Sequence, residues 1–173
     1  ETIRLMFDMQ DIVNNISVPM DNGKNSTLDN ICFKPFGPDG ACAIQSILQY
    51  WQMDRQTFEL AASNHPGKSD WMEFCFQHWI TREECFSAFK APMDPKLVFG
   101  GFPRDQGNII YSNESNSLIV IYLVDNSDAN LDAALAFEEK FIDAVQGKLV
   151  GMARDHNLSL SYSSESSVQK ELE

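Results

Sequence analysis

Four cysteines are the residues of this chain whose type and spacing could do chemistry: Cys32, Cys42, Cys75 and Cys85. They form two close pairs with nine residues inside each, and no C-x-x-C spacing occurs. Zinc sites usually place Cys or His ligands about two to four residues apart, whereas the three histidines here are scattered. A cysteine nucleophile needs a positioned base, and neither segment carries a protease signature. We therefore interpret the cysteines as two disulfides and expect neither a metal nor a cofactor.

The number of cysteines does not settle their pairing, because four cysteines permit three pairings. Proximity in the sequence favours Cys32–Cys42 and Cys75–Cys85. Closing a loop of this length stabilises the folded chain by about 2.5–3 kcal/mol on the chain-entropy model. Disulfides of this kind are typical of an oxidising compartment.

Other patterns that could support catalysis are weak. The acid pairs Glu83–Glu84 and Glu138–Glu139 could serve glycoside hydrolysis, but adjacent carboxylates on a helix point in different directions and both pairs fit solvated faces. No G-x-S-x-G elbow is present, and Gly100–Gly101 lacks the further glycines of a dinucleotide-binding fingerprint. We therefore predict an interaction module that is not an enzyme.

Asparagine usage agrees with the compartment that the cysteines indicate. N-x-S/T sequons occur at Asn15, Asn25, Asn113 and Asn157, which is more than chance would supply. Sequons accept N-glycans in lumenal and extracellular domains. We predict that two or three of these four positions carry glycans, and we predict an oxidising, lumenal or extracellular location.

Charge and hydrophobicity narrow the class of partner. The formal net charge of −12 makes nucleic acid a poor partner, because phosphate binding needs clustered Lys and Arg. Hydrophobic content of 43% argues against disorder, and the longest strongly apolar run, 118–124, is too short to span a bilayer. The chain begins at Glu1 without Met or a leader, so we expect a processed product or a fragment.

Periodicity predicts the elements that position these residues, in an α/β chain of one domain. We expect amphipathic helices over 3–16, 41–52, 70–79 and 129–153, a loop or short hairpin before Cys32, and a helix that begins near 165. We expect a strand over 116–126, apolar on both faces and therefore central or covered on both sides, and a half-exposed strand over 157–166. Residues 63–70 should form an exposed loop.

The ordered segments resemble a known family. "DNICFKPFG", "AIQSILQYW", "FCFQHW" before "CFSAFKAPMDP", "LVFGGF", "SLIVIYLVDN", "AFEEKFIDAV" and "NLSLSYSSESSVQKELE" are similar to the middle lumenal domain of Niemann–Pick type C sterol transporters, and most similar to plant-like members. The resemblance covers nearly the whole chain from about residue 3, and the order of the segments carries it.

The resemblance implies a fold and a location. The parent would be a polytopic membrane protein of the Patched and resistance–nodulation–division superfamily, in the membrane of the lysosome, late endosome or vacuole. Residues 1–173 would be a single lumenal domain between its second and third transmembrane helices. The implied fold is an α+β, ferredoxin-like antiparallel sheet core with packed helices, protruding loops and the disulfides Cys32–Cys42 and Cys75–Cys85.

The resemblance also implies a function without catalysis. The domain would receive a soluble Niemann–Pick type C2-like sterol carrier and would work beside other lumenal domains of its own chain, for sterol export. One family tip loop falls from Asp54 to Asp70, and the other falls before Glu1. Because this loop is shorter and lacks the aromatic cluster of animal members, no individual contact residue is transferred. The alternatives are an independent secreted, disulfide-linked ligand-binding module and a Patched-like receptor ectodomain.

Overall fold

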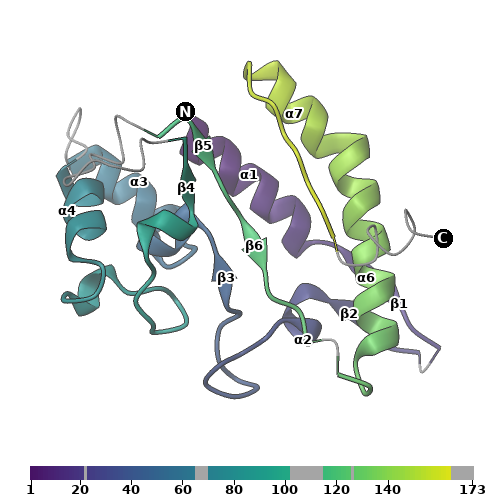
Figure 1. Cartoon of the computed structure of the whole chain (residues 1–173). Helices are drawn as coiled ribbons and strands as arrows, with labels where there is room; N and C mark the ends of the chain where they lie inside the picture. The colour runs from purple at the N-terminus through teal and green to yellow at the C-terminus, as the bar shows by residue number, and fades with distance from the viewer. Residues whose placement is uncertain (22, 65–69, 102–114, 126, 165–173) are drawn as a thin grey trace. The chain divides into compact units, whose positions relative to one another are not determined.

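A computed structural model describes the chain except for residues 22, 65–69, 102–114, 126 and 165–173. The chain divides into two compact units (Figure 1). Unit 1 comprises Glu1–Cys32 and Val124–Glu173, and unit 2 comprises Phe33–Leu123. The expectation of a single domain over residues 1–173 stays a prediction. None of the helices in the described part is long and apolar enough to cross a membrane.

Unit 1 is built on two helical runs and a hairpin. Helix α1 (Thr2–Asn14) buries a stripe at helical spacing, with Leu5 and Val13 among its members. Strands β1 (Ser17–Pro19) and β2 (Asn25–Thr27) pair antiparallel, and α2 (Leu28–Ile31) begins at a capping box formed by Thr27 and Asn30. Helix α6 (Leu131–Ala144), the π-helical turn η4 (Val145–Leu149) and α7 (Val150–Asp155) form one continuous run, and α6 packs on α1, α2 and the hairpin. The predicted helices over 3–16 and 129–153 and the predicted hairpin are confirmed.

The strand predicted over 157–166 is wrong for its described part. Helix α7 ends where Asn157 adopts a left-handed backbone conformation, and residues 157–164 form no strand. The Tyr162 hydroxyl instead bonds with the side-chain amide of Gln146 on η4. The alternation of apolar and polar residues therefore reflects a segment that lies along a helix. The helix predicted from 165 falls outside the described residues.

Unit 2 combines short strands with helices around an aromatic core. Its elements in order are β3 (Ile44–Gln45), η1 (Ile47–Trp51), α3 (Arg55–Asn64), α4 (Asp70–His78), η2 (Glu83–Cys85), η3 (Pro95–Leu97), β4 (Phe99–Gly100), β5 (Ser117–Leu118) and β6 (Ile121–Tyr122). Phe76 of α4 lies edge-on to Tyr50 and Phe99, with ring centroids 4.9 and 4.8 Å apart. Such edge-to-face pairs add to the burial of the rings themselves and link α4 to η1 and β4.

The helix predicted over 41–52 is also wrong in type. Residues 44–45 pair as a strand, and only 47–51 are helical, as a 3₁₀-helix whose first turn is capped by the Ser46 hydroxyl. Gln52 and Met53 then take positive φ angles of 54° and 59°, which end the helix. Every residue of 47–51 is buried, so the sequence has no polar face here from which the helical spacing could be recognised.

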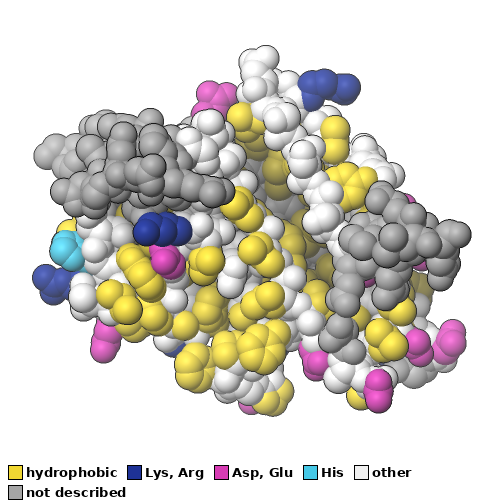
Figure 2. All heavy atoms as spheres, in the orientation of Figure 1, with side chains coloured by type: hydrophobic (Ala, Val, Ile, Leu, Met, Phe, Trp, Pro, Cys, Tyr) yellow, Lys and Arg dark blue, Asp and Glu magenta, His cyan; other side chains and the backbone are white. Residues whose placement is uncertain are grey.

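The predicted strand over 116–126 is present only in pieces. β5 pairs antiparallel with β4, and β6 pairs antiparallel with β3. Described strands therefore form three two-stranded sheets instead of one continuous sheet. The expected cover on both sides is wrong: residues 119–121, 123 and 124 are exposed, and hydrophobic side chains gather on the surface over β3 and β6 (Figure 2). The α+β class, the antiparallel pairing and the presence of two disulfides are confirmed.

Candidate functional site

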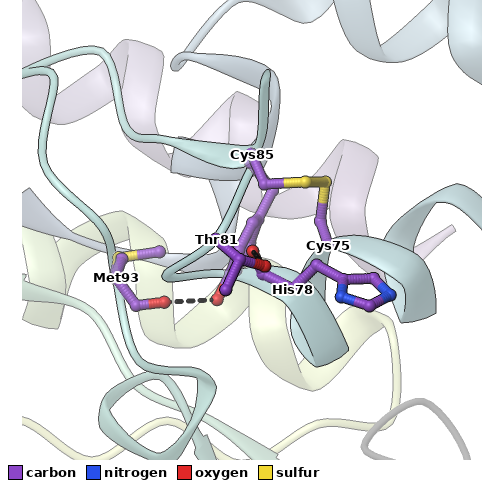
Figure 3. Close-up of a disulfide and its surroundings, with 6 residues drawn as sticks. Cys75, His78, Thr81, Cys85 and Met93 are labelled. Carbon is purple, nitrogen blue, oxygen red and sulfur yellow. Dashed lines mark hydrogen bonds between the residues drawn. A yellow bond between two sulfur atoms is a disulfide. The ribbon is translucent and has the colours of Figure 1, made fainter. Parts of the chain in front are cut away.

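A buried disulfide fixes the C-terminal end of α4. Cys75 and Cys85 are joined with a Cα–Cα distance of 5.2 Å, and both residues are at most 1% exposed. Between them the chain turns at His78, whose carbonyl accepts from the amides of Thr81 and Arg82 at 3.0 and 3.1 Å. Figure 3 shows the His78 ring directed away from the sulfur atoms. The predicted pair Cys75–Cys85 is thus formed, and it holds α4 against the turn that follows.

The other two cysteines are bonded as well. Cys32 and Cys42 are both in the disulfide state, and no cysteine is free. The pairing of Cys32 with Cys42 stays a prediction. Nucleophilic and metal-binding cysteines act as thiolates, so these sulfur atoms are structural.

Two buried polar side chains that the sequence did not reveal hold unit 2 together. Gln49 of η1 is 1% exposed; its amide nitrogen donates to the Ile44 carbonyl at 2.7 Å, and its amide oxygen accepts from the Ala88 backbone N–H at 3.0 Å. The Tyr50 hydroxyl donates to the Met93 carbonyl at 2.7 Å (the dashed bond that reaches Met93 in Figure 3). Both side chains satisfy backbone groups on loops far away in sequence, and so they fix those loops.

The candidate tip loop, Asp54 to Asp70, follows η1 along the chain, and its described part consists largely of α3. The Asp54 carboxylate caps α3 by accepting from the Thr57 amide and hydroxyl at 2.7 and 2.5 Å. The Thr57 hydroxyl, followed by its amide, lowers the pKa of Asp54 from its ordinary value of 3.8. Phe58 packs edge-on against Trp51 with centroids 5.0 Å apart, whereas Leu60 is 55% exposed. Residues 65–69 lie outside the described part, so the contact residues of the loop stay a prediction.

Three of the four predicted glycosylation sites are described, and all three are exposed: Asn15, Asn25 and Asn157. Each belongs to unit 1 and lies at the end of an element, after α1, at the start of β2 and after α7. Exposed positions of this kind are accessible to glycan transfer. Asn113 falls outside the described residues.

The acid pairs assemble no catalytic arrangement with other described residues. Glu83 and Glu84 are exposed on η2, and Glu138 and Glu139 lie toward solvent on α6. A depression beside Glu83 has a volume of about 320 Å³ and is lined by Gln52, Glu83, Phe86, Ser87 and Lys90. It holds one carboxylate and one amine, and its described lining contains no histidine to act as a base beside Ser87.

The geometry defines a class of protein: an α+β domain with two disulfides, whose fixed frame presents exposed loops and which shows no assembled catalytic group among its described residues. Comparison with known families identifies it further. The model of the family "NPC1, middle luminal domain" matches residues 1–166, so the chain belongs to that family.

Individual relatives agree with this assignment. The chain is 29% identical over 153 residues to "NPC1-like intracellular cholesterol transporter 1" of Homo sapiens, which covers 75% of the chain and 11% of the relative. It is 27% identical over 191 residues to "NPC intracellular cholesterol transporter 1" of Sus scrofa, covering 99% of the chain and 14% of the relative. It is 24% identical to "NPC intracellular cholesterol transporter 1 homolog 1b" of Drosophila melanogaster, covering 96% and 14%. The chain thus spans 11–14% of the length of these relatives.

Proposed function

We propose that this chain is the lumenal docking domain of an intracellular sterol transporter. It receives sterol from a soluble Niemann–Pick type C2-like carrier, for export from the lysosome, late endosome or vacuole, and it catalyses no reaction itself. The observation that carries the proposal is the family match over residues 1–166. The relatives that match are named as cholesterol transporters, which supports the choice of sterol as cargo.

The fixed frame of unit 2 supports docking through the candidate tip loop. The loop starts at a capped helix, and the segment that follows it is anchored by the Cys75–Cys85 disulfide and by Phe76 in the core. A loop held at both ends loses less conformational freedom when a partner binds, which leaves more of the contact energy for affinity. Leu60, exposed on α3, is the described side chain best suited to contact the carrier.

A binding titration tests the proposal. The soluble carrier of the same organism is titrated, at about pH 5 as in an endosomal lumen, against a polypeptide that also contains the segment before Glu1. We expect saturable binding that Leu60→Asp weakens and that Ile80→Asp leaves unchanged, since Ile80 is equally exposed but lies after α4. Absence of binding by the longer, folded polypeptide would refute docking. Reading the surrounding gene for transmembrane segments separates the transporter from an independent secreted module.

A further inference from the structure

The depression beside Glu83 on unit 2 brings together polar side chains that have no partner in the described protein. We call it the Phe86 depression, after the aromatic residue of its lining; its other lining residues are Gln52, Glu83, Ser87 and Lys90. Gln52, Glu83 and Lys90 are exposed, and none of their side chains forms a hydrogen bond or an ion pair with another described residue. An amide, a carboxylate and an ammonium are therefore all available to a ligand in one place.

The chain around the Phe86 depression is fixed by hydrogen bonds and burial. Ser87 is 1% exposed; its hydroxyl donates to the Ala91 carbonyl at 2.8 Å and accepts from the Ala91 amide at 3.2 Å. The Lys90 amide donates to the Ser87 carbonyl at 2.9 Å and closes the turn that carries the ammonium. Glu83 lies two residues before Cys85, which is buried and disulfide-bonded. A site on such a backbone has little freedom to lose when a ligand binds.

Two of the lining residues have an uncommon backbone conformation. Gln52, which ends η1, has a φ of 54°, and Lys90 has a φ of 59°. Residues other than glycine seldom adopt this left-handed region, because it costs free energy. They persist there only where the surrounding structure fixes them, and they are concentrated at ligand-binding sites. Two such residues from separate turns line the same depression, which favours a binding role.

The mixture of polar groups selects the class of ligand. The lining has one ammonium and one carboxylate, and the whole chain has a net charge of −12, so the depression is suited neither to an anion nor to a metal cation. The carboxylate of Glu83 only accepts hydrogen bonds, the ammonium of Lys90 only donates them, and the amide of Gln52 does both. A neutral ligand with several neighbouring hydroxyls can serve all three groups at once, because each hydroxyl donates and accepts.

We propose that the Phe86 depression binds one ring of a neutral sugar. The carbon-bound hydrogens of a pyranose ring form an apolar face that packs on aromatic residues, and Phe86 is half-buried in the lining. The volume of about 320 Å³ lies at the lower end of the range of about 300–1,000 Å³ for ligand pockets, which suits a single ring. A zwitterion such as a free amino acid is disfavoured, because ion pairs at exposed positions contribute little. This inference does not rest on the binding of the carrier.

An NMR titration of the isotope-labelled chain tests this site. The probes are the methyl glycosides of glucose, mannose and N-acetylglucosamine, with glycerol as a small polyol control and glycine as a zwitterion control. We expect at least one glycoside to shift the backbone amide signals of residues 83–90 in a saturable way, and we expect neither control to do so.

Single substitutions assign the binding to the lining. Glu83→Ala and Lys90→Gly should each raise the dissociation constant by roughly tenfold, because each removes a charged hydrogen-bonding group. Glycine at position 90 accepts the φ of 59° without strain, so this variant keeps the turn. Glu84→Ala is the matched control, since Glu84 is exposed on the same η2 but lies outside the lining, and it should leave the dissociation constant unchanged. The unliganded spectrum of each variant shows that it is folded.

Several outcomes would overturn the proposal. It is wrong if no glycoside shifts these signals, if glycerol or glycine shifts them equally, or if Glu84→Ala weakens binding as much as Glu83→Ala does. A glycopeptide with an asparagine-linked oligosaccharide, titrated in the same way, identifies the source of the sugar. Tighter binding than that of the methyl glycosides supports a ring carried on a protein, and equal or weaker binding supports a free sugar.

Discussion

Gln49 offers the sharpest test of how unit 2 is held together. Gln49→Leu keeps a side chain of similar length but removes the amide that joins the Ile44 carbonyl to the Ala88 amide. The buried Ile44 carbonyl and the part-buried Ala88 amide each lose a partner, and a buried unsatisfied group costs about 1–3 kcal/mol. Part of this loss is recovered from the more apolar side chain, so we expect the free energy of unfolding to fall by about 2–4 kcal/mol.

The assay is urea unfolding followed by tryptophan fluorescence, because the buried Trp51 ends the same 3₁₀-helix. Tyr50→Phe is the matched control: it removes one buried hydrogen bond, to the Met93 carbonyl, and should cost about 1–2 kcal/mol. A loss below about 1 kcal/mol for Gln49→Leu, with an unchanged denaturant slope, would show that the freed groups find other partners and would refute this reasoning.

Gln49→Glu adds a pH test at the same position. The introduced carboxylate can still accept from the Ala88 amide, but it faces the Ile44 carbonyl and donates to it only when protonated. Burial raises the pKa of such a carboxyl above its unfolded value. The variant should therefore gain stability relative to Gln49→Leu as the pH falls through that raised pKa and lose it as the pH rises. An unchanged difference between the two variants from acid to neutral pH would contradict the geometry.

Three further predictions follow from single features. Replacing both Cys75 and Cys85 by Ala should lower the free energy of unfolding by about 2.5–3 kcal/mol in chemical denaturation; a loss near zero would mean that packing alone holds α4. Ser159→Ala and Asn157→Gln should both remove the glycan at Asn157, as a mobility-shift assay would show. Only Asn157→Gln should also lower the melting temperature, because Asn157 has a φ of 58° at the end of α7. Equal melting temperatures of the two variants would contradict a role of Asn157 in ending the helix. Asp54→Asn keeps a cap for α3 but removes a carboxylate whose pKa is lowered mainly by the Thr57 hydroxyl. The native chain should therefore have a higher melting temperature than the variant at pH values over 3.8, and this difference should vanish as the pH falls through the lowered pKa. A difference in melting temperature that persists in stronger acid would refute the role of the carboxylate as a cap.

The sequence predicted those features that depend on local spacing. Helix α1 and the run from α6 to α7 keep a polar side at a period of 3.6 residues, and the cysteine pairs are close enough in sequence to find one another. The prediction of a helix over 41–52 is wrong because residues 44–51 are nearly all buried. Spacing alone therefore does not distinguish a strand followed by a 3₁₀-helix from a single α-helix. Gln49 could not be predicted at all, because its partner Ala88 lies 39 residues away.

The wrong prediction for the strand over 116–126 is more informative than the helix predictions that are confirmed. The local sequence of 116–126 indicates burial on both sides, whereas Ile119, Val120, Ile121, Leu123 and Val124 are all 36–40% exposed. When a local pattern and the tertiary structure disagree, the conflict either marks a site of interaction or lowers stability with no return. Here the Phe33 amide donates to the Leu123 carbonyl of the exposed segment at 2.8 Å, and Phe33 and Phe36 are themselves exposed, which favours interaction.

The two units differ in net charge and in the number of sequons. Unit 1 has fifteen acidic residues against six basic ones and contains the sequon asparagines Asn15, Asn25 and Asn157. Unit 2 has a net charge of only −3 and contains one sequon asparagine, Asn113, which falls outside the described residues. If the sequons of unit 1 carry glycans, a partner that docked on this unit would have to displace bulky hydrated glycans. It would also have to remove acidic side chains from water without offering them opposite charges. Docking is less costly on unit 2, where the net charge is smaller and the candidate tip loop exposes Leu60. Removal of the sequons at Asn15, Asn25 and Asn157 should therefore leave carrier binding through the candidate tip loop unchanged in the binding titration, and weaker binding by the chain without these glycans would contradict this assignment.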